Sequence, residues 1–295
     1  MEAIPLPVDP PVQRALAALE LARPMLDRRP TLVVSDFDGT LARLNLDPWA
    51  AAILPLARRA LRHLAATPGV EVVLLSGRTV VDLAARTRVG GATYLGNHGA
   101  ERGHLQRGGR AERIQVAVEP APDDATQTAL RLADGVPQLV PEPWLVVERK
   151  IPAVAFHFRG APDVPAAASR VRAAVERLDP EQALVRFQGK RVIELRPAGA
   201  PAKGDAMRAL LDEHRPRVAF VLGDGRDDAL AFDVLRQARS RGECDGLALA
   251  VAAHSDVLAD IAPSADLVLE SQVEAARFLS GLARQLETSA GGLNP

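Results

Sequence analysis

Short apolar runs that alternate with helical segments are the feature of this chain that most constrains its fold. Each run spans a few residues and is bounded by polar or glycine-containing turns; the runs lie at 31–35, 70–75, 93–95, 218–222, 247–251 and 267–269. Runs this short between turn signals are typical of buried parallel strands. Their alternation with helices favours an open sheet covered on both faces. The sequence therefore predicts an α/β fold with a doubly wound, mainly parallel sheet.

A second pattern interrupts the first between residues 109 and 199. There we expect helices at 123–134 and 163–178 and strands at 114–118, 144–149, 152–158, 183–187 and 191–195. Adjacent strands with helices on one side predict an inserted α+β domain. The expected organisation is a helical extension at 1–29, a core of 30–108 and 200–285, the insert at 109–199, and a flexible tail at 286–295.

The composition excludes several classes of protein. With 36 Lys and Arg against 37 Asp and Glu, and only 3% aromatic residues, the chain offers nucleic acid neither a basic field nor stacking platforms. The single cysteine, Cys244, excludes an intramolecular disulfide and a cysteine-rich zinc site. No apolar stretch approaches the roughly 20 residues of a membrane-spanning helix, and the start of the chain lacks a signal-peptide pattern. We expect a soluble, monomeric, cytoplasmic protein that binds neither nucleic acid nor membrane.

Two carboxylates directly follow the first apolar run. Asp36 and Asp38 belong to Ser35-Asp36-Phe37-Asp38-Gly39-Thr40-Leu41, at the strand end where open α/β sheets bind ligands. Carboxylates this close favour a bound cation or a shared proton. One can act as nucleophile while the other acts as acid and base. A solvated turn is the alternative for Asp-X-Asp alone; the Gly-Thr continuation after a strand favours chemistry.

Two further segments have the residue types that hold a phosphate. Ser76, Gly77 and Arg78 follow the second run, where a hydroxyl and backbone N–H groups suit a phosphate oxygen. Lys203 opens a helix and is suited to neutralise phosphate and the aspartate nucleophile. Taken singly, each has a structural alternative, because Ser-Gly commonly starts helices and a lysine at a helix start is commonly solvated.

A final acidic segment follows the run at 218–222. Asp224 and Asp228 lie in Gly223-Asp224-Gly225-Arg226-Asp227-Asp228-Ala229. Oxygen-only ligands indicate Mg²⁺ rather than a transition metal. Read alone, Gly-Asp-Gly also suits a turn or a calcium loop.

The order of these four segments resembles the haloacid-dehalogenase-type (HAD) phosphatase superfamily and its Rossmann-like core. The resemblance implies that Asp36 forms an aspartyl-phosphate, while Asp38 protonates the leaving alcohol and then activates water. It implies that Ser76 and Lys203 hold the phosphoryl group. By the same resemblance, Mg²⁺ is held by Asp36, the backbone carbonyl of Asp38, and Asp224, with Asp228 in support.

Most of residues 30–280 is similar to the trehalose-6-phosphate phosphatases. The similar segments are Ser76-Gly77-Arg78, Gly96-Asn97-His98-Gly99-Ala100-Glu101, Glu148-Arg149-Lys150, Ala155-Phe156-His157-Phe158-Arg159 and Gly189-Lys190-Arg191-Val192-Ile193-Glu194-Leu195-Arg196-Pro197. That family carries an α/β cap between its second and third motifs, which is where the insert falls. The resemblance implies a trehalose-6-phosphate synthase as functional partner, and it implies substrate binding by Gly77, Arg78, Asn97, His98, Lys150, Lys190 and Glu194.

These candidates also have structural alternatives. Asn97-His98 suits a loop turn, and Glu148 and Lys150 alternate with apolar residues as on a solvated sheet face. Lys190 and Glu194 share a strand face and suit a salt bridge. The fourth motif departs from the family pattern Gly-Asp-Asp-X-Thr-Asp-Glu: Gly225 and Ala229 remove two acids, and Asp227 replaces the threonine. This departure leaves open how the metal is supported and, less directly, which sugar is bound.

The leading hypothesis is a Mg²⁺-dependent phosphatase that hydrolyses trehalose 6-phosphate to trehalose and phosphate. The same chemistry on another sugar phosphate, such as sucrose phosphate or mannosyl-3-phosphoglycerate, is the first alternative. A phosphomutase and a non-catalytic sugar-phosphate-binding domain are the others.

Overall fold

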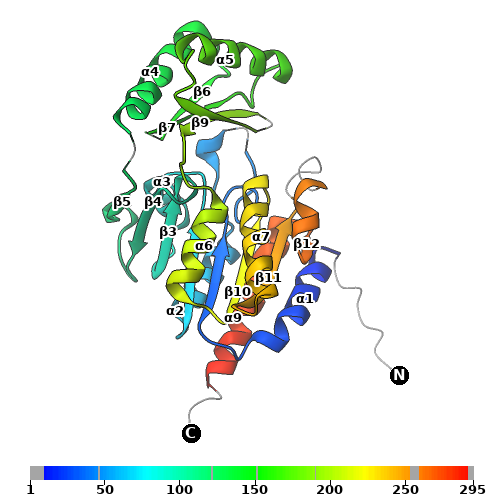
Figure 1. Ribbon diagram of the computed structural model, residues 1–295. Helices are drawn as coiled ribbons and strands as arrows, with labels where there is room; N and C mark the ends of the chain where they lie inside the picture. Colours follow the sequence, from blue (N-terminus) through cyan, green and yellow to red (C-terminus); the bar gives the residue numbers. More distant parts are fainter. Residues whose placement is uncertain are drawn as a thin grey trace. The chain divides into compact units, whose positions relative to one another are not determined.

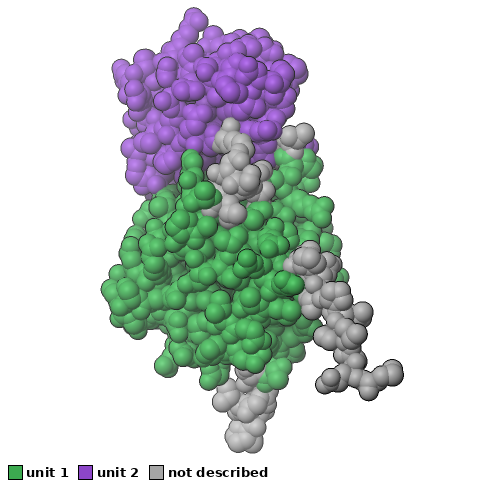
Figure 2. All heavy atoms as spheres, turned by 90° about the vertical axis from the view of Figure 1, so that its right-hand side faces the viewer, with its two compact units in different colours: residues 1–45, 49–117, 201–295 green, residues 46–48, 118–200 purple. Residues whose placement is uncertain are grey.

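The structure is a computed structural model that describes residues 10–45, 47–120, 122–150, 152–189, 191–252 and 259–291. The chain divides into two compact units, coloured separately in Figure 2. Unit 1 comprises Met1–Asn45, Trp49–Ala117 and Pro201–Pro295, and unit 2 comprises Leu46–Pro48 and Val118–Ala200. Unit 2 is thus an insertion in the sequence of unit 1.

In the described part of unit 1, eight strands form one sheet in the order β12-β11-β10-β1-β2-β3-β4-β5. From β12 to β3 all neighbours are parallel, and β4 runs antiparallel to β3. The doubly wound, mainly parallel sheet is therefore confirmed. The strand bounds are β1 Thr31–Ser35, β2 Val70–Leu75, β3 Ala92–Gly96, β4 Glu101–Leu105, β5 Val116–Val118, β10 Val218–Gly223, β11 Asp245–Val251 and β12 Leu267–Leu269.

Helices cover both faces of this sheet (Figure 1). Alternate residues of β1 point to opposite faces, so Val33 packs into one buried cluster and Leu32 and Val34 into the other. The first cluster takes side chains from α1 Pro10–Ala22, α2 Pro55–Ala66, α3 Val80–Thr87 and α9 Gln272–Gly291; the second takes them from α6 Lys203–His214 and α7 Arg226–Ser240. This layering buries the central strands and leaves their carboxyl ends as the place for polar side chains.

Unit 2 is a four-stranded antiparallel sheet with two helices. The strand order is β6-β7-β9-β8, and the elements are α4 Asp123–Leu139, β6 Val146–Lys150, β7 Ala153–His157, α5 Val164–Leu178, β8 Leu184–Gln188 and β9 Val192–Pro197. Val154, Phe156 and Ile193 pack with α4 and α5 in a third buried cluster. The residues that alternate with them form the opposite face of the sheet.

Two local expectations were wrong. The strand at 114–118 was expected in the insert, but β5 belongs to the sheet of unit 1, where Ile114 and Val116 pack against its core. An isolated apolar run cannot show which sheet it joins. Residues 286–291 were expected in a flexible tail, but they form the end of α9, anchored by the buried Leu286; residues 292–295 lie outside the described residues.

None of the helices among the described residues is both long and apolar enough to cross a membrane.

Candidate active site

Three adjacent parallel strands bring the predicted motifs to one edge of the sheet. Asp36 follows β1, Ser76 follows β2, and Asp224 follows β10. In the register of the sheet, Ser35 lies opposite both Leu222 and Leu74, so the three strands end side by side. The structure therefore places these segments where open α/β sheets commonly bind ligands.

Glycine at position 39 lets the loop that carries Asp36 and Asp38 lie against the loop that carries Asp224. Gly39 has a φ of 78°, and a Cβ built there would meet the Asp224 Oδ2 at 2.0 Å. A side chain at 39 would thus both strain the backbone and displace Asp224. From the other side, the Gln272 amide at the start of α9 donates a hydrogen bond to the Gly39 carbonyl over 2.9 Å.

Lys203 joins two of the acids. Its Nζ donates to Asp36 Oδ1 and to Asp228 Oδ1, both over 2.7 Å, and all three side chains are buried. Burial raises the pKa of Asp36 to about 7, against the opposing attraction of Lys203. Burial lowers the pKa of Lys203, but the attraction of Asp228 and Asp36 outweighs it, and the net direction is upward. The lysine therefore stays charged between the two carboxylates.

Three carboxylates converge closely enough to bind one cation. One oxygen from each of Asp36, Asp224 and Asp228 lies within 4.8 Å of the others. Burial, and then repulsion by Asp36 and Asp228, raises the pKa of Asp224 well above its ordinary value. Three acids gather around one lysine here, and the donor atoms are all oxygens. This arrangement fits a hard divalent cation such as Mg²⁺.

Asp228 also orders the loop that carries Asp224. Its Oδ2 accepts hydrogen bonds from the backbone N–H groups of Asp224, over 3.1 Å, and Gly225, over 2.9 Å. A Cβ built on Gly225 would lie 3.4 Å from the same oxygen, an ordinary contact. Loss of an acid at 225 therefore leaves the arrangement of Asp224 and Asp228 intact.

Asp227, the acid that replaces the family's threonine, contacts His98. Its Oδ2 lies 3.0 Å from His98 Nδ1. The opposite edge of that ring faces the second motif, because a Cβ on Gly77 would lie 2.8 Å from His98 Nε2. This contact of Asp227 with His98 thus links the fourth motif to the loop of Ser76 and Gly77.

Asn97 and His98 form the turn after β3 with left-handed φ values of 45° and 61°. The Asn97 Nδ2 donates to Glu101 Oε1 over 2.6 Å, while Glu101 Oε2 accepts from the backbone N–H of Val80, at the start of α3, over 2.7 Å. Asn97 therefore stabilises the turn. This turn also holds the loop of the second motif, because the backbone N–H of His98 donates to the Ser76 carbonyl over 3.0 Å.

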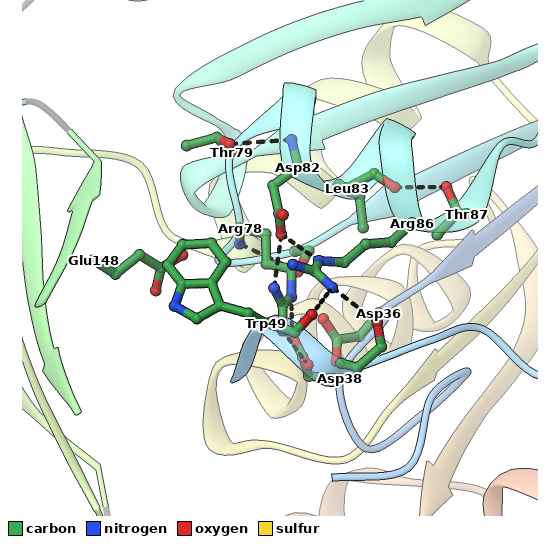
Figure 3. A network of polar contacts seen from close by, with 12 residues as sticks. Asp36, Asp38, Trp49, Arg78, Thr79, Asp82, Leu83, Arg86, Thr87 and Glu148 are labelled. Atoms are coloured by element: carbon green, nitrogen blue, oxygen red, sulfur yellow. Dashed lines mark hydrogen bonds and ion pairs between the residues drawn. The ribbon is translucent and has the colours of Figure 1, made fainter. Parts of the chain in front are cut away.

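Arg78 contacts carboxylates of the protein. Its Nε and Nη2 donate to the two oxygens of Asp38 over 2.6 and 2.8 Å, and its Nη1 donates to Asp82 over 2.7 Å (Figure 3). The Ser76 hydroxyl, in the same loop, accepts from the Arg78 backbone N–H over 3.3 Å. The structure thus connects the second motif to Asp38, a contact that sequence reasoning missed.

Within unit 2, a charged cluster occupies the sheet face opposite the helices. Lys150 Nζ lies 3.2 Å from Glu194 Oε1 and 3.5 Å from Glu148 Oε2. His157 Nε2 lies 2.9 Å from the same Glu148 oxygen, and Arg196 Nη2 donates to Glu194 Oε2 over 2.9 Å. Burial lowers the pKa of Lys150, but the attraction of Glu194 and Glu148 makes the net shift upward. The sheet thus brings Lys150 and Glu194 together, and Lys190 lies outside the described residues.

Sequence reasoning did not select Arg196 or Gln272. Arg196 stands two residues after Glu194 on β9, so the period of a strand already places both on one face. Its guanidinium also stacks over the Phe187 ring, 4.4 Å from the centroid. Gln272 has no signal in its sequence surroundings, because its role depends on where α9 begins relative to the Gly39 loop.

Comparisons with known proteins agree with this arrangement. Residues 34–259 match the family model described as trehalose-phosphatase. A trehalose-phosphate phosphatase of Mycobacterium tuberculosis is 36% identical over 282 residues, covering 92% of this chain and 66% of that protein; one of Mycobacterium avium is 35% identical over 269 residues, covering 88% and 63%. The chain thus spans slightly less than two thirds of these relatives. The solved C-terminal domain of Candida albicans trehalose-6-phosphate phosphatase has the same fold, with a TM-score of 0.71 at 20% identity, covering 95% of this chain and 99% of that one.

Proposed function

The chain belongs to the trehalose-phosphatase family, and on that premise we propose that it is a Mg²⁺-dependent phosphatase that hydrolyses trehalose 6-phosphate to trehalose and phosphate. The observation that carries the proposal is Lys203, buried between Asp36 and Asp228 where three acids converge. A buried ion pair of this kind adds little to stability compared with well-packed apolar residues. The arrangement is therefore better explained by chemistry that needs an oriented nucleophile, a cation and a phosphate-binding charge.

The first half of the proposed reaction transfers the phosphoryl group to Asp36. Lys203 holds Oδ1, and we assign the attack on phosphorus to Oδ2. The phosphorus–oxygen bond to the sugar breaks as the new bond forms, and Asp38 gives its proton to the departing sugar oxygen. Asp38 is suited to this because its side chain is 29% exposed, whereas Asp36 is buried.

The second half releases phosphate. Asp38, now a carboxylate, takes a proton from water; the oxygen of that water attacks phosphorus, and the bond to Asp36 breaks. Asp36 and Asp38 thereby return to their starting protonation states. Ser76 and Lys203 bind phosphoryl oxygens in both halves.

Asp36, Asp224 and the backbone carbonyl of Asp38 would hold Mg²⁺, supported by Asp228. When bound, the cation offsets the repulsion between the carboxylates and the anionic phosphoryl group.

Removal of divalent cations is expected to abolish turnover and to lower stability. Protein dialysed against a chelator should lose at least about 100-fold in kcat with trehalose 6-phosphate. Added Mg²⁺ should restore kcat and raise Tm, because the ion binds only the folded arrangement of acids. Asp224→Asn should weaken the Mg²⁺ effect on Tm, a readout that does not depend on activity. Full turnover by the chelated protein would contradict the proposed metal dependence.

The choice of sugar rests on family membership and on the charged face of unit 2. Carboxylates and cations placed together there suit the hydroxyl groups of a disaccharide. A panel of trehalose 6-phosphate, sucrose 6-phosphate, mannosyl-3-phosphoglycerate and glucose 6-phosphate tests the assignment. We expect kcat/KM to be highest for trehalose 6-phosphate by at least about tenfold. A preference for another member of the panel would overturn the sugar assignment and leave the chemistry standing.

Lys150 is expected to bind the sugar rather than the reacting phosphorus. Lys150→Met should raise KM for trehalose 6-phosphate by about 10- to 100-fold, the range for one charged hydrogen bond. Its kcat/KM for 4-nitrophenyl phosphate, which has no sugar, should change little. Arg149→Met is the matched control, because Arg149 is the preceding residue of β6, points to the other face and pairs with Asp134. Equal losses in both variants, or with both substrates, would contradict this role.

We also propose that the protein acts in the cytoplasm, together with a trehalose-6-phosphate synthase that supplies its substrate. Cys244 is a free, buried thiol, which suits a reducing compartment.

A further inference from the structure

Arg78 grips Asp38 with the planar fork of its guanidinium. The two donors, Nε and Nη2, contact the two different oxygens of the same carboxylate, over 2.6 and 2.8 Å. A two-point contact of this kind fixes the position of the carboxylate and also the plane in which it lies. A lysine offers only a point charge at such a site. The orientation of Asp38 in this structure is therefore set by Arg78.

The guanidinium of Arg78 also contacts a second carboxylate and an aromatic ring, and Figure 3 shows the contact with the carboxylate of Asp82. Its Nη1 donates to Asp82 Oδ2 over 2.7 Å, and its Cζ lies 5.3 Å from the centroid of the Phe37 ring. The side chain of Arg78 is 7% exposed. Burial, ring contact and the second carboxylate together fix the arginine before any ligand binds.

The second carboxylate is anchored in turn by a second arginine. Arg86 Nε donates to the same oxygen of Asp82 over 2.7 Å, one turn further along α3. Arg86 Nη1 donates to the backbone carbonyls of Trp49 and Ala51, over 2.7 and 2.9 Å. Asp38, Arg78, Asp82 and Arg86, here called the acid-holding network, thus form a continuous chain of charged hydrogen bonds within unit 1.

Binding phosphate through the fork formed by Nε and Nη2 of Arg78 would require this network to open, because both of these donors contact Asp38. Both hydrogen bonds to Asp38 would be lost, leaving its half-buried carboxylate without the cation that faces it, which is costly. Proton transfer, by contrast, requires a carboxyl group held within hydrogen-bond reach of the leaving oxygen. The two-point contact with Arg78 fixes the carboxyl group of Asp38 in one place and one plane, which suits proton transfer.

We propose that Arg78 is a positioning residue that holds Asp38 for proton transfer, and that it is not a ligand of the substrate phosphate. The inference rests on the proposed function, because it assigns Asp38 as the acid and base of a phosphatase. In the first half of the reaction one oxygen of Asp38 carries the proton while the other keeps its hydrogen bond from Arg78. The proton goes to the sugar oxygen, and the two-point contact with Arg78 stabilises the carboxylate that remains. In the second half Arg78 holds this carboxylate toward the attacking water.

The role predicts a dependence on the leaving group. A sugar alkoxide is a poor leaving group that needs the proton from Asp38, whereas 4-nitrophenolate leaves without it. Since kcat/KM reports the steps up to the first irreversible one, Arg78→Met should lower kcat/KM for trehalose 6-phosphate by about 30-fold or more, because a displaced acid loses part of the usual 10²–10⁴-fold worth of acid–base catalysis. The kcat/KM for 4-nitrophenyl phosphate should fall by less than about threefold. By contrast, kcat should fall with both substrates, because the release of phosphate from Asp36 needs Asp38 as the base.

The experiment compares Arg78→Met, Arg78→Lys and Asp82→Asn with wild type on both substrates, and measures inhibition by inorganic phosphate. Arg78→Lys should resemble Arg78→Met, because a lysine lacks the fork. Asp82→Asn should show the same selectivity with a smaller loss. Arg102→Met is the matched control: Arg102 forms a two-point pair with Glu213, on the surface and outside the acid-holding network, and its loss should leave both substrates within about twofold.

With an active wild type, two outcomes would overturn the inference. Equal losses of kcat/KM with both substrates, together with weakened inhibition by phosphate, would make Arg78 a phosphate ligand. Equal losses with unchanged phosphate inhibition would make it a residue of general structural importance. If wild type prefers a sugar phosphate other than trehalose 6-phosphate, only the sugar assignment fails. The role of Arg78 is then tested by comparing the preferred sugar phosphate with 4-nitrophenyl phosphate. A wild-type protein that hydrolyses no phosphate ester would overturn both proposals.

Discussion

Replacing Asp36 with asparagine is expected to lower kcat with trehalose 6-phosphate by at least about 1,000-fold, because the amide is a far weaker nucleophile than the carboxylate. Asparagine has nearly the same shape and keeps an oxygen toward Lys203, so the buried packing around β1 is retained. Steady-state assays with Mg²⁺ in excess measure the loss. Thermal unfolding in the same buffer shows whether the variant is folded.

Asp245→Asn is the control for this variant. Asp245 begins β11, at the opposite end of the same parallel sheet, and its side chain pairs with Arg28 at the surface. Its replacement should leave kcat within about twofold. An Asp36→Asn protein that is folded and turns over at the wild-type rate would refute a covalent mechanism through Asp36.

Replacing Lys203 with methionine is expected to damage both activity and stability. The buried carboxylates of Asp36 and Asp228 would lose the cation that lies 2.7 Å from each. Breaking one partner of a buried charge pair typically costs about 3–5 kcal/mol of unfolding free energy. Activity should fall by at least about 100-fold, because the same ammonium is assigned to the phosphoryl group. Denaturant titration and steady-state assays measure the two losses separately.

The stability of Lys203→Met is also expected to depend on added Mg²⁺. Mg²⁺ should recover part of the lost stability, because a second cation can offset the acids that Lys203 leaves behind. Arg208→Met is the matched control on the same helix, where an exposed pair with Asp205 should contribute no more than about 1 kcal/mol. Equal stability of Lys203→Met and wild type would contradict the view that these acids are held by the lysine.

Much of the fold was predictable because the chain alternates strand and helix with little ambiguity. Runs such as Val70–Leu75 and Val218–Gly223 are short, apolar and flanked by turn residues, which fixes the strands and their parallel arrangement. The sheet to which an edge strand belongs is not encoded this way, so β5 was placed wrongly. The end of α9 was missed because it depends on the packing of side chains such as Leu286.

The location of a candidate residue was predictable where its motif directly follows a strand or opens a helix. Asp36 and Asp224 follow strands of one sheet, and Lys203 opens a helix that packs on that sheet, so the order of the motifs already brings them together. Contacts between motifs were not predictable, because they depend on side-chain directions across loops. The grip of Arg78 on Asp38 joins residues 40 apart, and the pair of His98 and Asp227 joins a strained turn to a helix start.

Trapping the phosphoryl group on the protein tests the central claim most directly. Wild type is mixed with trehalose 6-phosphate labelled on phosphorus and quenched in acid within one turnover, and the label that stays on the protein is counted. A parallel quenched sample is reduced, which releases the phosphate and converts the acyl phosphate to an alcohol, and the altered residue is located by peptide mass. We expect labelled protein whose label decays as inorganic phosphate appears, and one reduced residue, at Asp36. Both signals should be absent from Asp36→Asn. Label on any other residue, or stoichiometric phosphate release throughout the first turnover with no labelled protein, would contradict the central claim.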